Sequence, residues 1–299
     1  MAILVITLPP GCRRESPDTT NATTQPPVRT SRPADPAPTE TAAYYDRTTR
    51  QFTLADFIKP SGENTPERII GMSPLFVREI AEPFADQHFG LSIEALLRKD
   101  AATQKDTRVI YYHEDTTTLA GIDRNRLSFL WIYDVERGPD VARTRTQGFR
   151  MTLDENGYAN FWEVLSPTGP RLVYVAQSIE DAASNEFGAA PADRRFAVER
   201  SLAEAPDTIV PRILPDGPQP MGPFVYIEGH DHEITTLLCR CMPSQVDDFR
   251  TNVLYELRPL PSGDSDTSAI SVFSDLLRRA DAVPLDAVLR IPNPPTAVP

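Results

Sequence analysis

The spacing of apolar residues changes along the chain from a helical to a strand-like period. Ser73 can cap a helix and Pro74 suits its first turn, and apolar residues then recur at positions 76, 77, 80 and 81. Residues 91–99 offer a second short helix, with apolar residues at positions 93, 96 and 97 on one side. We therefore predict two helices near the start of the folded part of the chain.

Beyond residue 107, β-branched and aromatic residues dominate, and turn signals recur at short intervals. Asn156 and Gly157 supply the positive φ of a tight hairpin, and Pro167 and Gly169 interrupt the pattern again soon afterwards. The apolar positions 161, 162 and 165 also fit a short helix, so that alternative is open for residues 159–165. The pattern favours strands over 108–113, 116–120, 127–133, 149–153, 159–165 and 172–177.

The last third of the chain combines further strands with two helices. Residues 179–187 predict a helix that ends at Gly188, and residues 268–280 predict an amphipathic terminal helix. Many short strands joined by turns, with helices near the start and end of the folded body, predict an α+β fold built largely of antiparallel β meanders. The remaining predicted strands are 195–199, 208–213, 224–228, 234–242 and 253–257.

Proline placement divides the chain into parts. The 30 prolines among 299 residues concentrate near the two ends and in the stretch 211–223. A segment rich in Pro, Thr and Ser with few large apolar residues cannot bury enough surface to offset the entropy lost on ordering. We expect a signal-like segment at 1–12, a disordered linker at 13–50, a single α+β body at 51–282 and a Pro-rich tail at 283–299.

An apolar run at residues 2–8 precedes Gly11 and Cys12. The run is too short to cross a bilayer, which needs about 20 apolar residues. An apolar segment that ends in a small residue before cysteine resembles the amino terminus of bacterial lipoproteins. The resemblance covers this segment only. It implies lipidation of Cys12, attachment to the membrane through the lipid, and an extracytoplasmic location on the periplasmic side, with residues 13–50 as a spacer.

Charge and motif content exclude some classes of protein. The net charge is −12 and basic side chains form no run longer than a pair, which argues against a nucleic-acid partner held by phosphate neutralisation. The motifs G-x-G-x-x-G, G-x-x-x-x-G-K-[ST], G-x-S-x-G, H-E-x-x-H and C-x-x-C do not occur in the sequence. Their absence excludes only sites that have a compact signature.

Residue types that bind metals gather in one stretch, GHDHEITTLLCRC. Imidazole and thiolate are preferred donors for zinc or copper, so His230, His232, Cys239 and Cys241 form a candidate four-ligand site. If the residues between them form a strand, His232 and Cys239 lie about 23 Å apart at ~3.3 Å per residue, which is too far for one coordination sphere.

A β-hairpin is the alternative interpretation of the same stretch. Residues 224–228 would pair with residues 234–242, and the His-Asp-His-Glu run would form the turn between them.

A set of aromatic residues is a second candidate for ligand contact. These side chains fit a groove for sugars or peptides, and core packing of a β-rich body explains them equally well. The set comprises Tyr111, Tyr112, Trp131, Tyr133, Trp162 and Tyr174.

No pattern in the sequence identifies a reaction. We expect an exported, lipid-anchored, non-catalytic binding or structural protein of the cell envelope, with a protein or small-molecule partner that the sequence does not specify. One alternative is an extracytoplasmic enzyme, such as a metal-assisted hydrolase that uses His113, His230 and His232 with nearby carboxylates. The other alternative is a cytosolic acidic interaction protein.

Overall fold

The computed structural model describes residues 40–80, 89–98, 108–138, 141–167, 169–204, 207–217, 221–229, 232–239, 253–261 and 267–288. Contacts along the chain divide it into two units, Met1–Ala37 and Pro38–Pro299. All the described residues belong to the second unit, and the fold below is the fold of that unit.

A twelve-stranded sheet forms the body of this unit. The strands are β1 (Ala55–Pro60), β2 (Leu75–Glu79), β3 (Arg108–Leu119), β4 (Ile122–Gly138), β5 (Val141–Leu153), β6 (Ala159–Leu165), β7 (Arg171–Ala176), β8 (Thr208–Ile209), β9 (Ile213–Leu214), β10 (Pro223–Ile227), β11 (Ile234–Cys239) and β12 (Val253–Pro259). They lie in the order β11-β10-β2-β1-β12-β3-β4-β5-β6-β7-β8, and β9 pairs with β7 as well.

The α+β class agrees with the structure, and the sheet is mixed: six of the described strand pairs are antiparallel and five are parallel. Strands β3 to β7 form the expected antiparallel meander. The pairs β1–β12, β12–β3 and β2–β10 are parallel, as are those of β7 with β8 and β9. The parallel pairs join strands that are distant in the sequence, and local turn signals report only on neighbouring strands.

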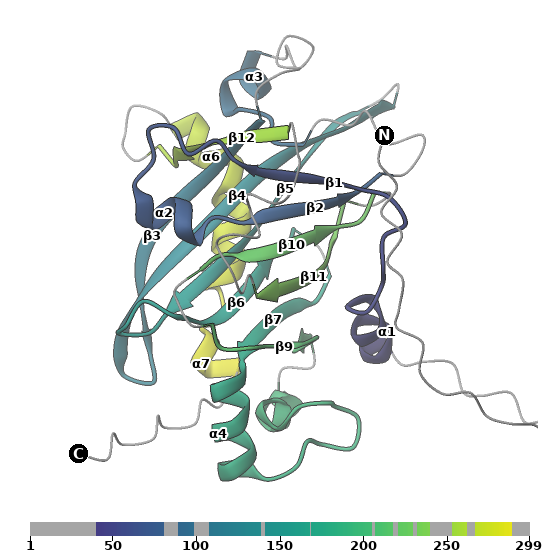
Figure 1. Ribbon diagram of the computed structural model, residues 1–299, viewed down its shortest axis with the longest axis vertical. Helices are drawn as coiled ribbons and strands as arrows, with labels where there is room; N and C mark the ends of the chain where they lie inside the picture. The colour runs from purple at the N-terminus through teal and green to yellow at the C-terminus, as the bar shows by residue number, and fades with distance from the viewer. Residues whose placement is uncertain are drawn as a thin grey trace, which may run out of the picture. The chain divides into compact units, whose positions relative to one another are not determined.

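The sheet curls around one apolar core. Side chains from every strand contribute to a single cluster of buried residues. Strands β9 and β11, which lie near opposite ends of the strand order, also contact each other (Figure 1). A flat sheet of this width would keep its two edges far apart. The sheet must therefore bend back on itself, in the direction that strand twist favours.

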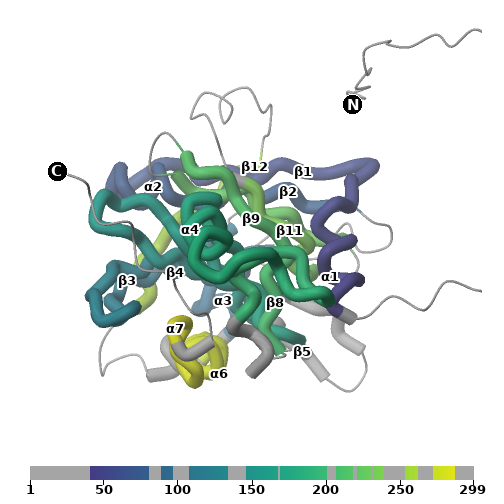
Figure 2. The backbone as a smooth tube through the Cα atoms, turned by 90° about the horizontal axis from the view of Figure 1, so that it is seen from below, coloured from purple at the N-terminus to yellow at the C-terminus, as the bar shows by residue number. Residues whose placement is uncertain are grey.

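Helices cover the outside and the ends of the curled sheet. Phe273 and Leu276 of α6 pack on Tyr111, Leu130 and Ile132, the side chains that β3 and β4 turn outward. Helix α4 packs beside β7 and β9 and against the 3₁₀ helix η3 (Figures 1 and 2). None of the described helices is both long and apolar enough to span a bilayer. Their bounds are α1 (Glu40–Arg47), α2 (Glu67–Met72), α3 (Ile93–Arg98), α4 (Gln177–Phe187), η3 (Ala197–Glu204), α6 (Thr267–Asp281) and α7 (Leu285–Val288).

Two predicted elements have the wrong type. The segment predicted as a helix from residue 74 is strand β2, and Leu75, Phe76, Val77 and Arg78 are all buried. A strand that is buried on both faces has a continuous apolar run, which also satisfies helical spacing. Most of the predicted strand at 195–199 is the start of η3. The segment is too short for its apolar residues to distinguish a helical from a strand-like period.

The folded body extends beyond the boundaries expected from composition. Helix α1 lies within the expected linker 13–50, and its Tyr45 is only 3% exposed in the core. Helix α7 lies within the expected tail 283–299, and Leu285 is buried against β7 and η3 residues. One large apolar side chain in each segment provides enough buried surface to dock a short helix.

Gly148 of β5 pairs with Leu130 of β4, and the space beside it is too small for a side chain. A Cβ atom at this position would lie 2.4 Å from the Phe129 carbonyl oxygen and 2.8 Å from a methyl group of Leu130. We expect Gly148→Ala to lower the free energy of unfolding by about 1–3 kcal/mol, because the β4 backbone must move to admit the methyl group. Urea unfolding followed by circular dichroism measures this loss.

Gly71→Ala is the matched control. Gly71 lies in α2, and a Cβ atom there would meet nothing within 4 Å. Alanine also lowers the entropy of the unfolded chain, so we expect a change between zero and a gain of about 1 kcal/mol. Equal losses in the two variants would contradict the steric explanation for Gly148.

Candidate binding site

The His-Asp-His-Glu run lies between two paired strands, and the structure describes His232 and Glu233 of it. Strands β10 and β11 pair in antiparallel register, from Pro223 opposite Cys239 to Ile227 opposite Ile234, which confirms the predicted pairing. In the turn, His232 has a φ of 54° and its backbone N–H donates to the Glu228 carbonyl oxygen at 3.1 Å.

The side chain of His232 lies inside the curled sheet. It is 3% exposed and stacks on Tyr133, with ring centroids 4.7 Å apart and an interplanar angle of 16°. Among the residues that the structure describes, no group of three or more His, Cys, Asp and Glu side chains is placed to hold a metal ion. The other candidate ligands, His230, Cys241 and the side chain of Cys239, lie outside the described residues, as does Cys12. The zinc or copper site stays a prediction.

His113 and His232 lie on opposite faces of the sheet. His113 shares the outer face of β3 with Tyr111, which packs on Phe273 of α6. His232 stacks on Tyr133, a member of the inner core cluster. A hydrolase centre that combines these two histidines is therefore not assembled in this fold.

Core packing accounts for most of the aromatic set. Tyr111, Trp131, Tyr133 and Tyr174 are at most 2% exposed, and Tyr112 is half-buried against the inner core. The first four of these side chains are therefore core residues. Trp162 differs from them, because it borders a cavity.

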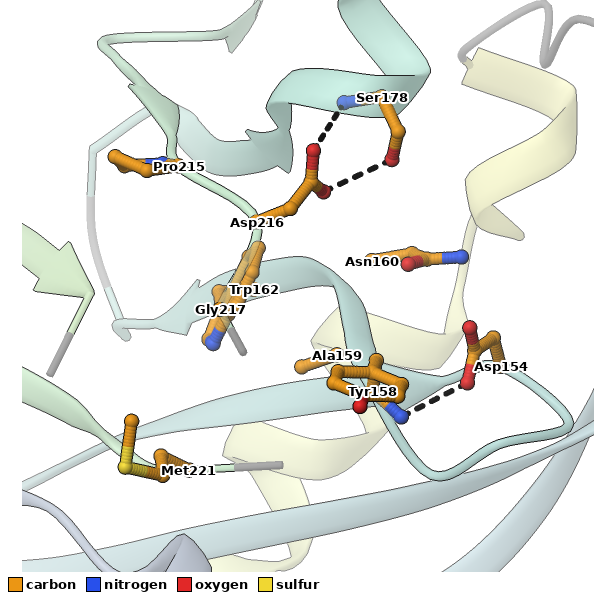
Figure 3. A pocket seen from close by; sticks show the side chains of 10 residues that line it. All are labelled: Asp154, Tyr158, Ala159, Asn160, Trp162, Ser178, Pro215, Asp216, Gly217 and Met221. Atoms are coloured by element: carbon orange, nitrogen blue, oxygen red, sulfur yellow. Dashed lines mark hydrogen bonds between the residues drawn. The ribbon is translucent and has the colours of Figure 1, made fainter. Parts of the chain in front are cut away.

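This cavity has a volume of about 240 Å³. Four parts of the described chain line it: the turn between β5 and β6, the start of β6, the start of α4, and residues 215–217 with Met221, which follow β9 (Figure 3). These segments are distant in the sequence and meet because the sheet curls. Strand β9 pairs with β7, which places the residues that follow β9 beside the cavity.

A β-bulge brings Asn160 to the cavity. Thr152 pairs with Phe161 but Leu153 pairs with Ala159, so β6 contains one extra residue at Asn160. The bulge breaks the alternation of strand faces, so the adjacent residues Ala159 and Asn160 both line the cavity. The Asn160 carboxamide makes no hydrogen bond within the described part of the chain.

Asp154 organises the turn that forms the neighbouring wall. Its Oδ1 accepts the backbone N–H groups of Asn156 at 2.9 Å and Tyr158 at 2.8 Å. Gly157 has a φ of 83°, which confirms the Asn-Gly turn that the sequence predicts. Both bonds fall on Oδ1, so Oδ2 is left to accept a further donor.

Asp216 caps the amino terminus of α4. Its Oδ2 accepts the Ser178 backbone N–H at 3.0 Å, and its Oδ1 accepts the Ser178 hydroxyl at 2.9 Å (Figure 3). A carboxylate at this position interacts favourably with the positive end of the helix dipole. The anion-binding capacity of this helix end is therefore already used by the protein itself.

Trp162 and Met221 supply the apolar part of the wall. Trp162 is 4% exposed, and its indole Nε1–H has no hydrogen-bond partner among the described residues. Figure 3 shows Trp162 beside Asp216 and Gly217, with Met221 below it. A buried indole N–H ordinarily finds an acceptor, because an unmade hydrogen bond costs about 1–3 kcal/mol.

The lining of the cavity combines acidic and neutral polar groups. Its described lining contains two carboxylates, of Asp154 and Asp216, and no Lys, Arg or His side chain. Ser178 supplies the only Ser or Thr hydroxyl among these lining residues, and it donates to Asp216. The polar groups of the described lining are therefore of the kind that make hydrogen bonds.

Sequence signals mark only some of the residues that line this cavity. The Asp154 turn and Trp162 were visible as a hairpin signal and an aromatic residue, whereas Asn160 depends on a bulge that has no local signature. Asp216 and Met221 lie in the Pro-rich stretch 211–223, where nothing in the sequence marks either as a contact of β6.

The buried charges on the outer face of β5 to β7 are paired. The side chains of Arg150 and Glu163, each 3% exposed, lie 3.0 Å apart, and Arg171 also contacts Glu163. Burial acts to raise the pKa of Asp281, but the nearby Arg150 and Arg126 outweigh it and lower that pKa. This network joins the carboxyl end of α6 to the sheet, and we assign it a structural role.

Glu199 has a shifted pKa, and among the described carboxylates with shifted pKa values it is the most deeply buried. Its two oxygens accept the Tyr45 hydroxyl at 3.0 and 2.8 Å, and they also accept the backbone N–H groups of Phe196 and Val210, each at 3.1 Å. Burial raises the pKa of Glu199, although hydrogen bonds from Tyr45 and the backbone oppose the shift. Glu199 thereby fixes α1 to η3.

Comparisons of the chain with protein-family models, with characterised proteins and with solved structures found no match.

Glu199 should make stability depend on pH in a defined direction. Its pKa is raised in the folded state, so its contribution is fully present below the unfolded value of about 4.3 and is lost as pH rises through the folded pKa. Glu199→Gln removes this titration. We subtract the free energy of unfolding of the unsubstituted protein from that of Glu199→Gln. We expect this difference to increase from pH 4 to pH 7, as measured by urea unfolding.

Glu155→Gln is the control, because Glu155 is an exposed carboxylate in the β5–β6 turn. The relative stability of this variant should change much less with pH than that of Glu199→Gln. Parallel pH profiles for the two variants would contradict a raised pKa at Glu199.

Proposed function

We propose that this chain is a lipid-anchored, extracytoplasmic binding protein that holds a small polar ligand in the cavity beside Trp162. The observation that carries the proposal is the convergence of an aromatic ring, an amide and two carboxylates on one cavity from four separate chain segments. A concave site with a few converging polar groups is the usual form of a small-molecule site.

Binding is favoured over catalysis by the state of the lining groups. Within the described lining, the Ser or Thr hydroxyl present is that of Ser178, which donates to Asp216, and both Asp216 oxygens accept from Ser178. The described lining residues include no Cys, His or Lys to serve as a nucleophile or a base near neutral pH. The groups with spare hydrogen-bonding capacity are those of Asp154, Asn160 and Trp162, which suit recognition.

The membrane part of the proposal rests on the sequence before the folded body. Cys12 follows an apolar run and Gly11, and the stretch between Cys12 and α1 is rich in Pro, Thr and Ser. This composition suits a spacer that holds a binding domain away from the membrane surface. We propose that lipid on Cys12 anchors the protein on the periplasmic side, without a nucleic-acid partner.

Lipidation is tested by expressing the full chain in a bacterial host supplied with radiolabelled palmitate. We expect label on the protein and partition into the detergent phase, and we expect Cys12→Ser to abolish both, because Cys12 is the acylated residue. Cys241→Ser is the matched control and should keep the label. An unlabelled wild-type chain, or equal labelling of the Cys12→Ser variant, would refute the anchor.

Ligand binding is tested by NMR on the protein labelled with ¹⁵N at tryptophan. The chain has two tryptophans, so two indole N–H signals are expected, and Trp162→Phe assigns them. Trp131 is an internal control, because it is fully buried among Phe76 and Phe89. We expect members of a small-fragment library to shift the Trp162 signal while the Trp131 signal stays fixed. If no fragment moves the Trp162 signal at millimolar concentration, the cavity is not a binding site.

A further inference from the structure

We infer that the ligand of this cavity is a neutral polyhydroxy compound, a single saccharide unit in size. The inference rests on the proposed binding function and names the chemistry that the lining groups would recognise. Three observations carry it: the charge of the lining, its unused hydrogen-bond donors, and its volume.

Charge excludes an anionic ligand. Asp154 and Asp216 both line the cavity, and among the described residues no basic side chain lines it to offset them. The amino terminus of α4 lies at the site and is capped by Asp216 through Ser178. A phosphate or carboxylate ligand would meet two like charges and would have to displace the protein's own carboxylate.

Unused donors argue against a simple cation. The Trp162 Nε1–H has no acceptor among the described residues, and the Asn160 carboxamide offers two further N–H donors. An ammonium group or a metal ion provides no acceptor atom, so it would leave these donors unsatisfied. The indole N–H of Trp131 also lacks a described acceptor, but that ring is enclosed among Phe76 and Phe89 and does not line the cavity.

Hydroxyl groups satisfy both kinds of lining group. Each hydroxyl donates one hydrogen bond and accepts two, so neighbouring hydroxyls can donate to Asp154 Oδ2 and accept from the Asn160 carboxamide. Hydrogen bonds to an ionised carboxylate are the stronger kind, which makes Asp154 the main determinant of affinity. The Met221 side chain and the ring of Tyr158 provide apolar contact for the C–H groups of a sugar ring.

Volume limits the ligand to one unit. The cavity of about 240 Å³ is smaller than the roughly 300–1,000 Å³ of sites that enclose drug-sized ligands. A single six-membered sugar ring is therefore the expected occupant, either free or at the end of a longer glycan.

The experiment titrates the tryptophan-labelled full chain with three classes of probe: glucose, galactose and N-acetylglucosamine as neutral saccharides, choline as a cation, and citrate as an anion. We expect at least one saccharide to shift the Trp162 indole signal with saturation, and choline and citrate to leave it unmoved. The Trp131 signal should stay fixed throughout.

Two variants test the assignment of the contacts. Asp154→Asn keeps an acceptor for the turn but removes the charge, and we expect it to weaken saccharide binding about tenfold or more. Asn160→Ala removes the amide at the bulge and should weaken binding by a similar factor. Glu155→Gln, in the same turn but absent from the lining, should bind as the unsubstituted protein does.

The outcomes separate this inference from the proposed function. Saturable binding of choline or citrate without any saccharide would overturn the polyhydroxy assignment while supporting the cavity as a binding site. If Asp154→Asn and Asn160→Ala both bind the saccharide with the same affinity as the unsubstituted protein, the assigned contacts are wrong and the inference fails with them. If neither these probes nor the fragment library shifts the Trp162 signal, the proposed function itself fails.

Discussion

The packing of every strand onto one shared core is the constraint on which the rest of this structure depends. Strands from the two ends of the sheet order bury side chains in the same cluster, so the sheet has to curl until β9 and β11 meet. Curling brings backbones unusually close. A Cβ at Gly148 would lie 2.4 Å from the Phe129 carbonyl oxygen, and one at Gly222 would lie 2.2 Å from that of Met72. A side chain at either position would force the neighbouring backbone to move, which favours glycine there.

The cavity beside Trp162 is a consequence of that curl. The short strand β9 returns the chain to β7, and the residues after it then pass over the start of β6. Asp216 is held by α4 and Asp154 is held by its own turn, so bonds that serve the fold also fix the site. A site whose polar groups are already positioned binds with little loss of conformational entropy, which favours specific recognition of a small ligand.

Local structure was predictable where the signal is local. The Asn156-Gly157 turn, the hairpin of β10 with β11, and the helix that became α6 all depend on residues within about fifteen positions of one another. Strand β2 was mistaken for a helix because burial on both faces removes the alternation that identifies a strand. The helices α1 and α7 were missed because the surface that stabilises them, around Tyr45 and Leu285, belongs to distant segments.

The sequence by itself determined the α+β class, the antiparallel meander from β3 to β7 and the expectation of lipidation at Cys12. Turn chemistry, strand periodicity and a short apolar run before cysteine are encoded in adjacent residues, so no knowledge of the fold is needed to find them. Only the tertiary structure decided the parallel pairings, the separation of His113 from His232, and the meeting of Asn160, Trp162 and Asp216 at one cavity. These features depend on the curvature of the sheet, which arises from the packing of all its strands together and is carried by no single segment.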